Sequence, residues 1–127
     1  MHRPFIAVST AVAALALAAC GHAPQPMPTK PFVHEGVTMS LYPPAAPDCK
    51  PTSVYTATLS WSVDGLGSPK TEVRIAKPDG QSFARSNDRK AKAETGKWVA
   101  PGTWFLLFDR KSGDMLGAVQ AGPTPCP

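Results

Sequence analysis

The segment Val54-Tyr55-Thr56-Ala57-Thr58-Leu59-Ser60-Trp61-Ser62-Val63 decides the fold class. From Tyr55 onward, every second residue of this run is apolar or aromatic, and the residues between them are threonine or serine. Successive side chains of a strand point to opposite faces, so the alternation predicts a strand with one buried face and one wet face. A helix would scatter the same residues around its circumference. A wet face indicates an antiparallel sheet, and a buried face requires a second layer to cover it.

Further strands are expected on both sides of this segment. The sequence predicts them over 36–42, 70–76, 81–85, 97–99, 103–109 and 115–121. Lys77-Pro78-Asp79-Gly80 has proline and glycine where a tight turn favours them, which makes 70–85 a hairpin. Residues 86–96 are polar and are expected to form a mobile loop. About seven short strands, with no helix after the first 19 residues, predict an all-β antiparallel sandwich over 36–127.

Several short motifs resemble those of bacterial immunoglobulin-like and fibronectin-type-III-like domains. They are Leu59-Ser60-Trp61 on an early strand, the turn at Pro78-Asp79-Gly80, Thr95-Gly96-Lys97-Trp98-Val99, and Pro101-Gly102-Thr103-Trp104-Phe105. The resemblance implies an immunoglobulin-like β-sandwich. The cysteine pair that joins the two sheets of antibody domains is missing, so another strand order or a small barrel remains an alternative.

The first 19 residues are typical of an export signal. A short basic end, His2 and Arg3, precedes an apolar segment that is too short to span a bilayer. Leu17-Ala18-Ala19-Cys20 resembles the lipobox of bacterial lipoproteins. This resemblance implies cleavage before Cys20, lipid attachment to its thiol, and a membrane anchor made of several acyl chains. In the lipoprotein family an aspartate after the cysteine favours retention in the inner membrane, so the resemblance with Gly21 in that place implies the outer membrane, on its periplasmic side.

Residues 20–35 are expected to be an acylated cysteine followed by a proline-rich tether. Prolines at 24, 26, 28 and 31 favour an extended path with a reach of roughly 40 Å. The three histidines lie at 2, 22 and 34, so the domain 36–127 contains none. It therefore lacks the commonest general base and the commonest zinc ligand.

The other two cysteines, Cys49 and Cys126, flank the predicted sheets. An oxidising compartment suits a disulfide between them. Closing a loop of roughly 80 residues would stabilise the fold by about 4 kcal/mol in the chain-entropy model. Two free thiols are the alternative.

Charge and motifs restrict the function. The net charge is +4, and the basic residues between 85 and 97 are interleaved with acids, as on a solvated loop. A contact to anionic lipid or to an acidic partner is the alternative. Export and the lack of a recognition motif speak against nucleic acid. No nucleophile, metal or phosphate-binding motif occurs, so neither an enzyme nor a cofactor or metal site is expected.

The segment 103–109 is the one stretch that exceeds the needs of a scaffold, because it is apolar on both parities. If Phe105 and Leu107 face the core, Trp104, Leu106 and Phe108 face outward and form a candidate binding stripe. Trp98 would extend it. The alternative is a central strand whose second face is covered by a loop, or a reversed register.

These features predict a membrane-anchored, non-catalytic lipoprotein whose sandwich binds an envelope protein, as an assembly or secretion accessory. Two alternatives stay open. One is an inhibitor or immunity-type lipoprotein that blocks a cell-wall hydrolase with the 86–96 segment. The other is a glycan-binding module that stacks sugar rings on Trp98 and Trp104.

Overall fold

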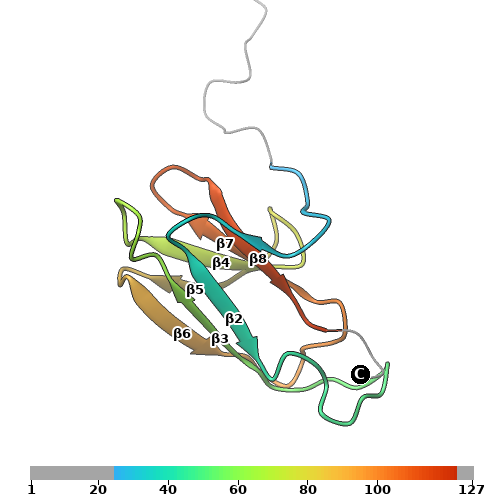
Figure 1. Ribbon diagram of the computed structural model, residues 1–127. Coiled ribbons are helices and arrows are strands. Elements are labelled where there is room, and N and C mark those ends of the chain that lie inside the picture. The colour runs from blue at the N-terminus through green and yellow to red at the C-terminus, as the bar shows by residue number, and fades with distance from the viewer. Residues whose placement is uncertain (1–24, 123–127) are drawn as a thin grey trace, which may run out of the picture.

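The computed structural model describes residues 25–122. The strands of this range form two antiparallel sheets. The larger sheet has the order β1-β8-β7-β4-β5, and the smaller has the order β2-β3-β6 (Figure 1). The all-β sandwich is confirmed. The strands are β1 (Phe32–Val33), β2 (Thr38–Tyr42), β3 (Thr58–Ser62), β4 (Thr71–Ile75), β5 (Ser82–Ser86), β6 (Lys90–Glu94), β7 (Trp104–Asp109) and β8 (Met115–Gln120).

The strand order follows the immunoglobulin-like pattern. In such domains the A, B and E strands share one sheet, and the G, F and C strands share the other, to which C′ can be added. Here β2, β3 and β6 take the first set of places, and β8, β7, β4 and β5 take the second. The expected hairpin over 70–85 is present as β4 and β5, with a register shift between Val73 and Arg74.

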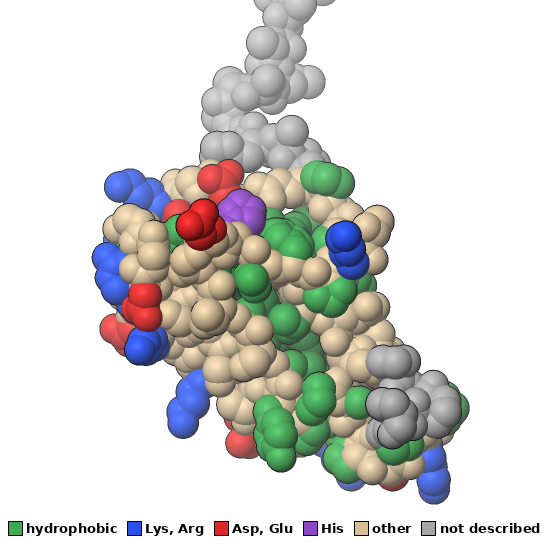
Figure 2. Space-filling view, viewed as in Figure 1, with side chains coloured by type: hydrophobic (Ala, Val, Ile, Leu, Met, Phe, Trp, Pro, Cys, Tyr) green, Lys and Arg blue, Asp and Glu red, His purple; other side chains and the backbone are tan. Residues whose placement is uncertain are grey.

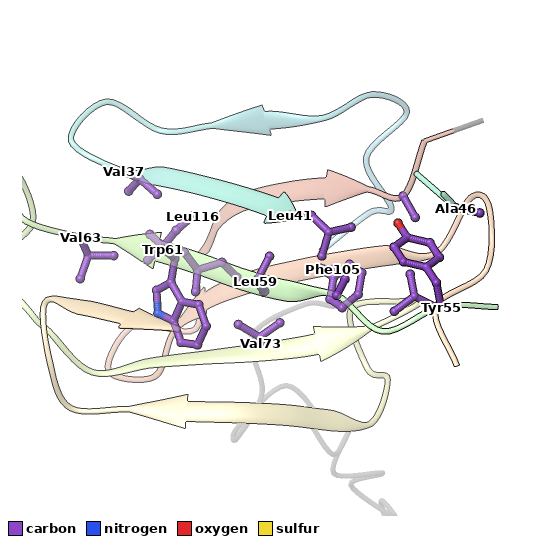
Figure 3. Packing of buried hydrophobic residues seen from close by; sticks show 14 residues of the cluster. Val37, Leu41, Ala46, Tyr55, Leu59, Trp61, Val63, Val73, Phe105 and Leu116 are labelled. Atoms are coloured by element: carbon purple, nitrogen blue, oxygen red, sulfur yellow. The ribbon is translucent and has the colours of Figure 1, made fainter. Parts of the chain in front are cut away.

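Of the segment 54–63 that the alternation predicts as one strand, Thr58–Ser62 form β3, and Tyr55 makes only an isolated bridge with Val99. Leu59 and Trp61 point between the sheets and are buried, whereas Ser60 and Ser62 lie on the outer face. Figure 3 shows Leu59 and Trp61 among side chains from both sheets, including Val73 and Phe105. Because these side chains interdigitate in one cluster, the two sheets share a single core.

The one polar group of Trp61 has a partner inside this core. Its indole Nε1 donates a hydrogen bond to Oγ1 of Thr71, 3.0 Å away, and Thr71 is itself fully buried on β4. Burying an indole N–H without an acceptor would cost free energy. The bond therefore lets a tryptophan of the smaller sheet pack against the larger one.

Residues 86–96 are not the loop that the sequence predicts. Lys90–Glu94 form β6, which pairs with β3 along its full length. The charged side chains of Lys90, Lys92 and Glu94 point to solvent, while Ala91 and Ala93 pack against the core. The strand was missed because its inward residues are only alanines, which carry little hydrophobic signal.

The N-terminal part of the described chain belongs to the sandwich. Phe32 and Val33 pair with Ala118 and Gly117 of β8. Seven residues earlier, the Gln25 side-chain amide binds the β7–β8 connection. Its Nε2 donates to the Gly113 carbonyl at 3.2 Å, and its Oε1 accepts from the Met115 amide at 2.8 Å. The ordered sheet therefore begins before residue 36, and residues 25–33 are fastened to it instead of forming a free tether.

Some expectations fall on residues outside the described range. The segment 1–19 expected to be a signal, the expected lipidation site Cys20 and Cys126 all do. The Cys49–Cys126 disulfide and the acylation therefore stay predictions. Within residues 25–122, the structure has no helix long and apolar enough to cross a bilayer.

The core makes a direct prediction about stability. Leu59→Ala removes a fully buried side chain at the centre of the inter-sheet cluster, so we expect a loss of about 2–5 kcal/mol in the free energy of unfolding. Ser60→Ala, one residue away on the outer face, should change it by no more than about 0.5 kcal/mol. Urea unfolding followed by tryptophan fluorescence measures both. Equal losses in the two variants would contradict the assigned faces of β3.

Candidate functional site

The predicted aromatic stripe on β7 is mostly buried. Phe105 and Leu107 face the inter-sheet core as expected, but Leu106 and Phe108 are buried as well. They form a second apolar cluster with Met115 and Ala118 of β8, against which Phe32 and Trp104 pack. The Arg74 guanidinium lies over the Phe108 ring, 5.0 Å from its centroid. The second face of β7 is therefore covered, as the alternative stated. Leu106 and Phe108 are core residues, and their prediction as binding residues was wrong.

Trp98 does not extend this stripe, because it lies on the opposite side of β7. Its ring stacks on Phe105, at 6.0 Å between centroids, and meets the edge of Phe83 at 5.8 Å. Phe105 faces the inter-sheet core, whereas Trp104 belongs to the outer cluster. Trp98 remains 39% exposed and Trp104 is half-buried. The two tryptophans therefore do not form one platform.

A partly exposed apolar band follows the side of the sandwich between β2 and β8. Figure 2 shows hydrophobic side chains gathered along this face, where β2 and β8 lie side by side in Figure 1. Met39 of β2 and Val33 of β1 both approach Gly117 of β8, within about 3.4 Å of where a Cβ on that glycine would lie. Tyr42 at the end of β2 is 76% exposed. We call the band formed by Val33 and Met39 over the buried Gly117 the β2–β8 seam; Tyr42, which alternates with the buried Leu41, lies on the outer face of the smaller sheet.

The two edges of the smaller sheet differ in chemistry. β6 carries Lys90 and Lys92, and lysines on an edge strand discourage pairing with another chain. β2 reads Thr38-Met39-Ser40-Leu41-Tyr42 and has neither a charge nor a proline. Within residues 25–122, backbone hydrogen bonds join β2 to β3 only. The outer backbone groups of β2 are therefore open to a further strand, and the apolar seam lies beside them.

A second feature is a charged cluster on the outer face of the larger sheet. Glu72 of β4 is 4% exposed, and each of its carboxylate oxygens accepts a hydrogen bond from an arginine. Nε of Arg74 lies 2.6 Å from Oε1, and Nε of Arg85, across the pair on β5, lies 2.6 Å from Oε2. Arg74 also donates from a terminal nitrogen to the Pro78 carbonyl at 2.6 Å. The buried carboxylate thus fixes two guanidinium groups side by side.

The environment of Glu72 acts on its ionisation in two opposite ways. Burial raises the pKa of the carboxyl because it removes water from the charged form, while the hydrogen bonds and charges of Arg74 and Arg85 lower it. The arginines outweigh burial, so the pKa of Glu72 lies below its ordinary value of 4.5. Glu72 is therefore charged at neutral pH.

These arginines line a pocket of about 610 Å³, which lies within the usual size range of ligand sites. Its wall also includes Phe108, Arg110 and Gln25. Arg110 donates to the Ser86 carbonyl at 2.9 Å and to the side-chain oxygen of Asn87. Its Nε is buried and has no hydrogen-bond partner among the described residues. We call this site the arginine pocket.

Sequence reasoning missed the arginine pocket. Glu72, Arg74 and Arg85 read as ordinary polar positions of a two-faced hairpin, and acids of this chain mostly adjoin turns. The spacing of Glu72 and Arg74 at i and i+2 does place both on one strand face, which was the available signal. The described residues hold no group of three or more side chains suited to bind a metal ion.

Comparison of the chain with protein families, with characterised proteins and with solved structures found no match. The function is therefore inferred from the residues themselves and from the geometry of the β2 edge and the arginine pocket.

The charged cluster predicts a specific pH dependence of stability. Because the pKa of Glu72 is lower in the folded state, its contribution is present above about pH 4.5 and is lost as the pH falls further. Glu72→Gln leaves two arginines without their carboxylate, so we expect it to lower the free energy of unfolding by about 1–3 kcal/mol at pH 7. The difference from the parent should shrink below pH 4.5.

Urea unfolding at a series of pH values measures this difference. Glu35→Gln, at an exposed position outside the strands, is the matched control and should cost no more than about 0.5 kcal/mol at any pH. A Glu72→Gln deficit that stays constant down to low pH would show that the carboxylate charge is not what matters.

Proposed function

We propose that this chain is a membrane-anchored, non-catalytic lipoprotein whose sandwich binds an envelope protein through the free edge of β2. The observation that carries the proposal is an edge strand without protecting charge beside a partly exposed apolar band, the β2–β8 seam. The partner is expected to offer an extended segment that pairs with β2 and places an apolar side chain on the seam. An accessory role in assembly or secretion fits such binding.

Strand addition explains why the two edges of one small sheet are so different. In this mode, main-chain hydrogen bonds supply affinity, and pockets for alternate side chains supply specificity. An unprotected edge is otherwise a liability that leads to aggregation. The lysines of β6 remove that liability on one side, while β2 keeps an open ladder and an exposed Tyr42. A binding function for β2 accounts for this asymmetry.

The lipid anchor is the second part of the proposal and comes from the lipobox Leu17-Ala18-Ala19-Cys20. The expected stand-off of roughly 40 Å does not fit the fastened N-terminal segment. Only five residue steps separate Cys20 from Gln25, which is bound to the β7–β8 connection. Five extended steps span at most about 18 Å. The sandwich would therefore sit close to the membrane surface, and we place it on the periplasmic side of the outer membrane.

Neither alternative function gains a specific observation. The hydrolase inhibitor was to use residues 86–96 as a plug, but 90–94 form a strand that pairs with β3. The glycan module was to use Trp98 and Trp104 together, but these side chains lie on opposite sides of β7.

The anchor predicts a labelling pattern. Cells that express the chain and are fed radiolabelled palmitate should incorporate label into it, because thiol lipidation and amino-terminal acylation both add acyl chains. Cys20→Ala should abolish incorporation and release the chain from the membrane fraction. Cys49→Ala, which removes a cysteine outside the lipobox, should keep the label. Label that persists in Cys20→Ala would contradict the assignment of the anchor.

The β2 edge predicts a positional crosslinking pattern. A photoreactive residue at Tyr42 should crosslink to one envelope protein in cells, and the same residue at Glu94, on the β6 edge, should not. With that partner purified, Ser40→Lys should weaken binding at least about tenfold, because it adds a protecting charge to the edge strand. Glu94→Gln changes the charge of the β6 edge by the same +1 and should leave affinity within about twofold. Equal loss in both variants would contradict binding at β2.

A further inference from the structure

We infer that the arginine pocket binds the phosphate of an anionic phospholipid headgroup in the membrane to which the chain is attached. The inference rests on the proposed anchor at Cys20, because the anchor determines which surface meets the membrane. It adds a second, non-covalent contact to the bilayer, on the outer face of the larger sheet.

The pocket presents arginine donors that are already fixed in place. Glu72 occupies only the Nε atoms of Arg74 and Arg85, so it orients both guanidinium groups without using all of their donors. Arg85 is 64% exposed, and its terminal nitrogens have no hydrogen-bond partner among the described residues. The planar fork of a guanidinium matches the geometry of phosphate oxygens. Preorganised donors of this kind reduce the entropy lost on binding.

Arg110 adds a third guanidinium, which hydrogen bonds to the Ser86 carbonyl and the Asn87 side chain hold in place. Its Nε is shielded from solvent, so Arg110 contributes positive charge to the pocket and not a free Nε donor. Arg110 lines the same pocket as Arg74 and Arg85. An anion in the pocket would lie among three guanidinium groups.

The pocket also contains acids, and they limit the kind of anion that fits. Glu72 is already saturated by two arginines, and Oδ1 of Asp109 accepts from the Lys111 amide at 2.8 Å. Asp79 lines the pocket from the β4–β5 turn and is exposed. With three arginines against three carboxylates, the pocket is formally neutral. Long-range attraction is therefore weak, and binding should depend on local contacts and on closeness to the surface.

Closeness to the surface is what favours a lipid over a soluble ligand. Gln25 lines the arginine pocket, and it follows Cys20 by five residues. An acyl-anchored Cys20 would hold the pocket within about 18 Å of the headgroup layer. Because the anchor would hold the pocket near the membrane, lipid headgroups would be present at a high effective concentration. A modest intrinsic affinity would then suffice. A basic site near an anionic membrane gains about fivefold in affinity per arginine or lysine.

The experiment uses the mature chain, residues 20–127, with Cys20→Ser to remove the lipid. Its partition into vesicles of phosphatidylglycerol and phosphatidylcholine is compared with partition into phosphatidylcholine alone, by sedimentation at low salt. We expect binding only to the vesicles with phosphatidylglycerol. Arg85→Gln should weaken it about fivefold, and Asp79→Asn should strengthen it by up to about fivefold.

Lys92→Gln, on the outer face of the smaller sheet, is the matched control for loss of one positive charge and should leave partition within about twofold. Arg85→Lys keeps the charge without the fork and should bind better than Arg85→Gln. Equal melting temperatures check that each variant is folded.

Three results would overturn the inference. They are equal partition into both kinds of vesicle, an equal loss in Lys92→Gln and Arg85→Gln, and displacement from vesicles by inorganic phosphate at concentrations that leave ionic strength unchanged. The last would identify a site for free phosphate. Because this chain carries no lipid, a failure here leaves the palmitate result intact, and a failure of palmitate labelling leaves the vesicle result intact.

Discussion

The structure depends on the burial of β7 on both faces. Phe105 and Leu107 fill the core between the sheets, while Leu106 and Phe108 need cover on the other side. A two-layer sandwich offers none, because its outer faces meet water. The chain solves this with the segment 25–33, which pairs with β8 through β1 and holds the β7–β8 connection through Gln25. Arg74 completes the cover over Phe108.

That constraint also explains how the surfaces divide. The segment that covers the outer face of the larger sheet leads back toward Cys20, so the proposed membrane anchor and the arginine pocket would lie on the same side. The β2 edge belongs to the other sheet and stays open beside the β2–β8 seam. In the proposed function, one sheet of the domain would meet the bilayer and the other would meet a protein partner.

Sequence reasoning predicted strands correctly where large apolar residues alternated strongly. It failed where a feature depends on contacts between distant parts of the chain. The 54–63 run predicted β3 and its buried face, since large apolar residues repeat with period two. β6 alternates as strictly, but alanine and lysine obscure it. The arginine pocket was missed although its hairpin was predicted, because its wall also needs the contact of Gln25 with residues 88 and 90 positions away. The apolar character of 103–109 was visible, but only the structure shows what covers its second face.

Amide hydrogen exchange at His34 and Met115 tests the central claim most directly. The His34 amide donates to the Leu116 carbonyl at 2.9 Å, and the Met115 amide donates to the Gln25 side chain at 2.8 Å. If residues 25–33 are an integral layer of the fold, both amides should exchange as slowly as those in the middle of β7 and β8. Exchange of both at the rate of an unstructured chain, while β7 stays protected, would contradict the account.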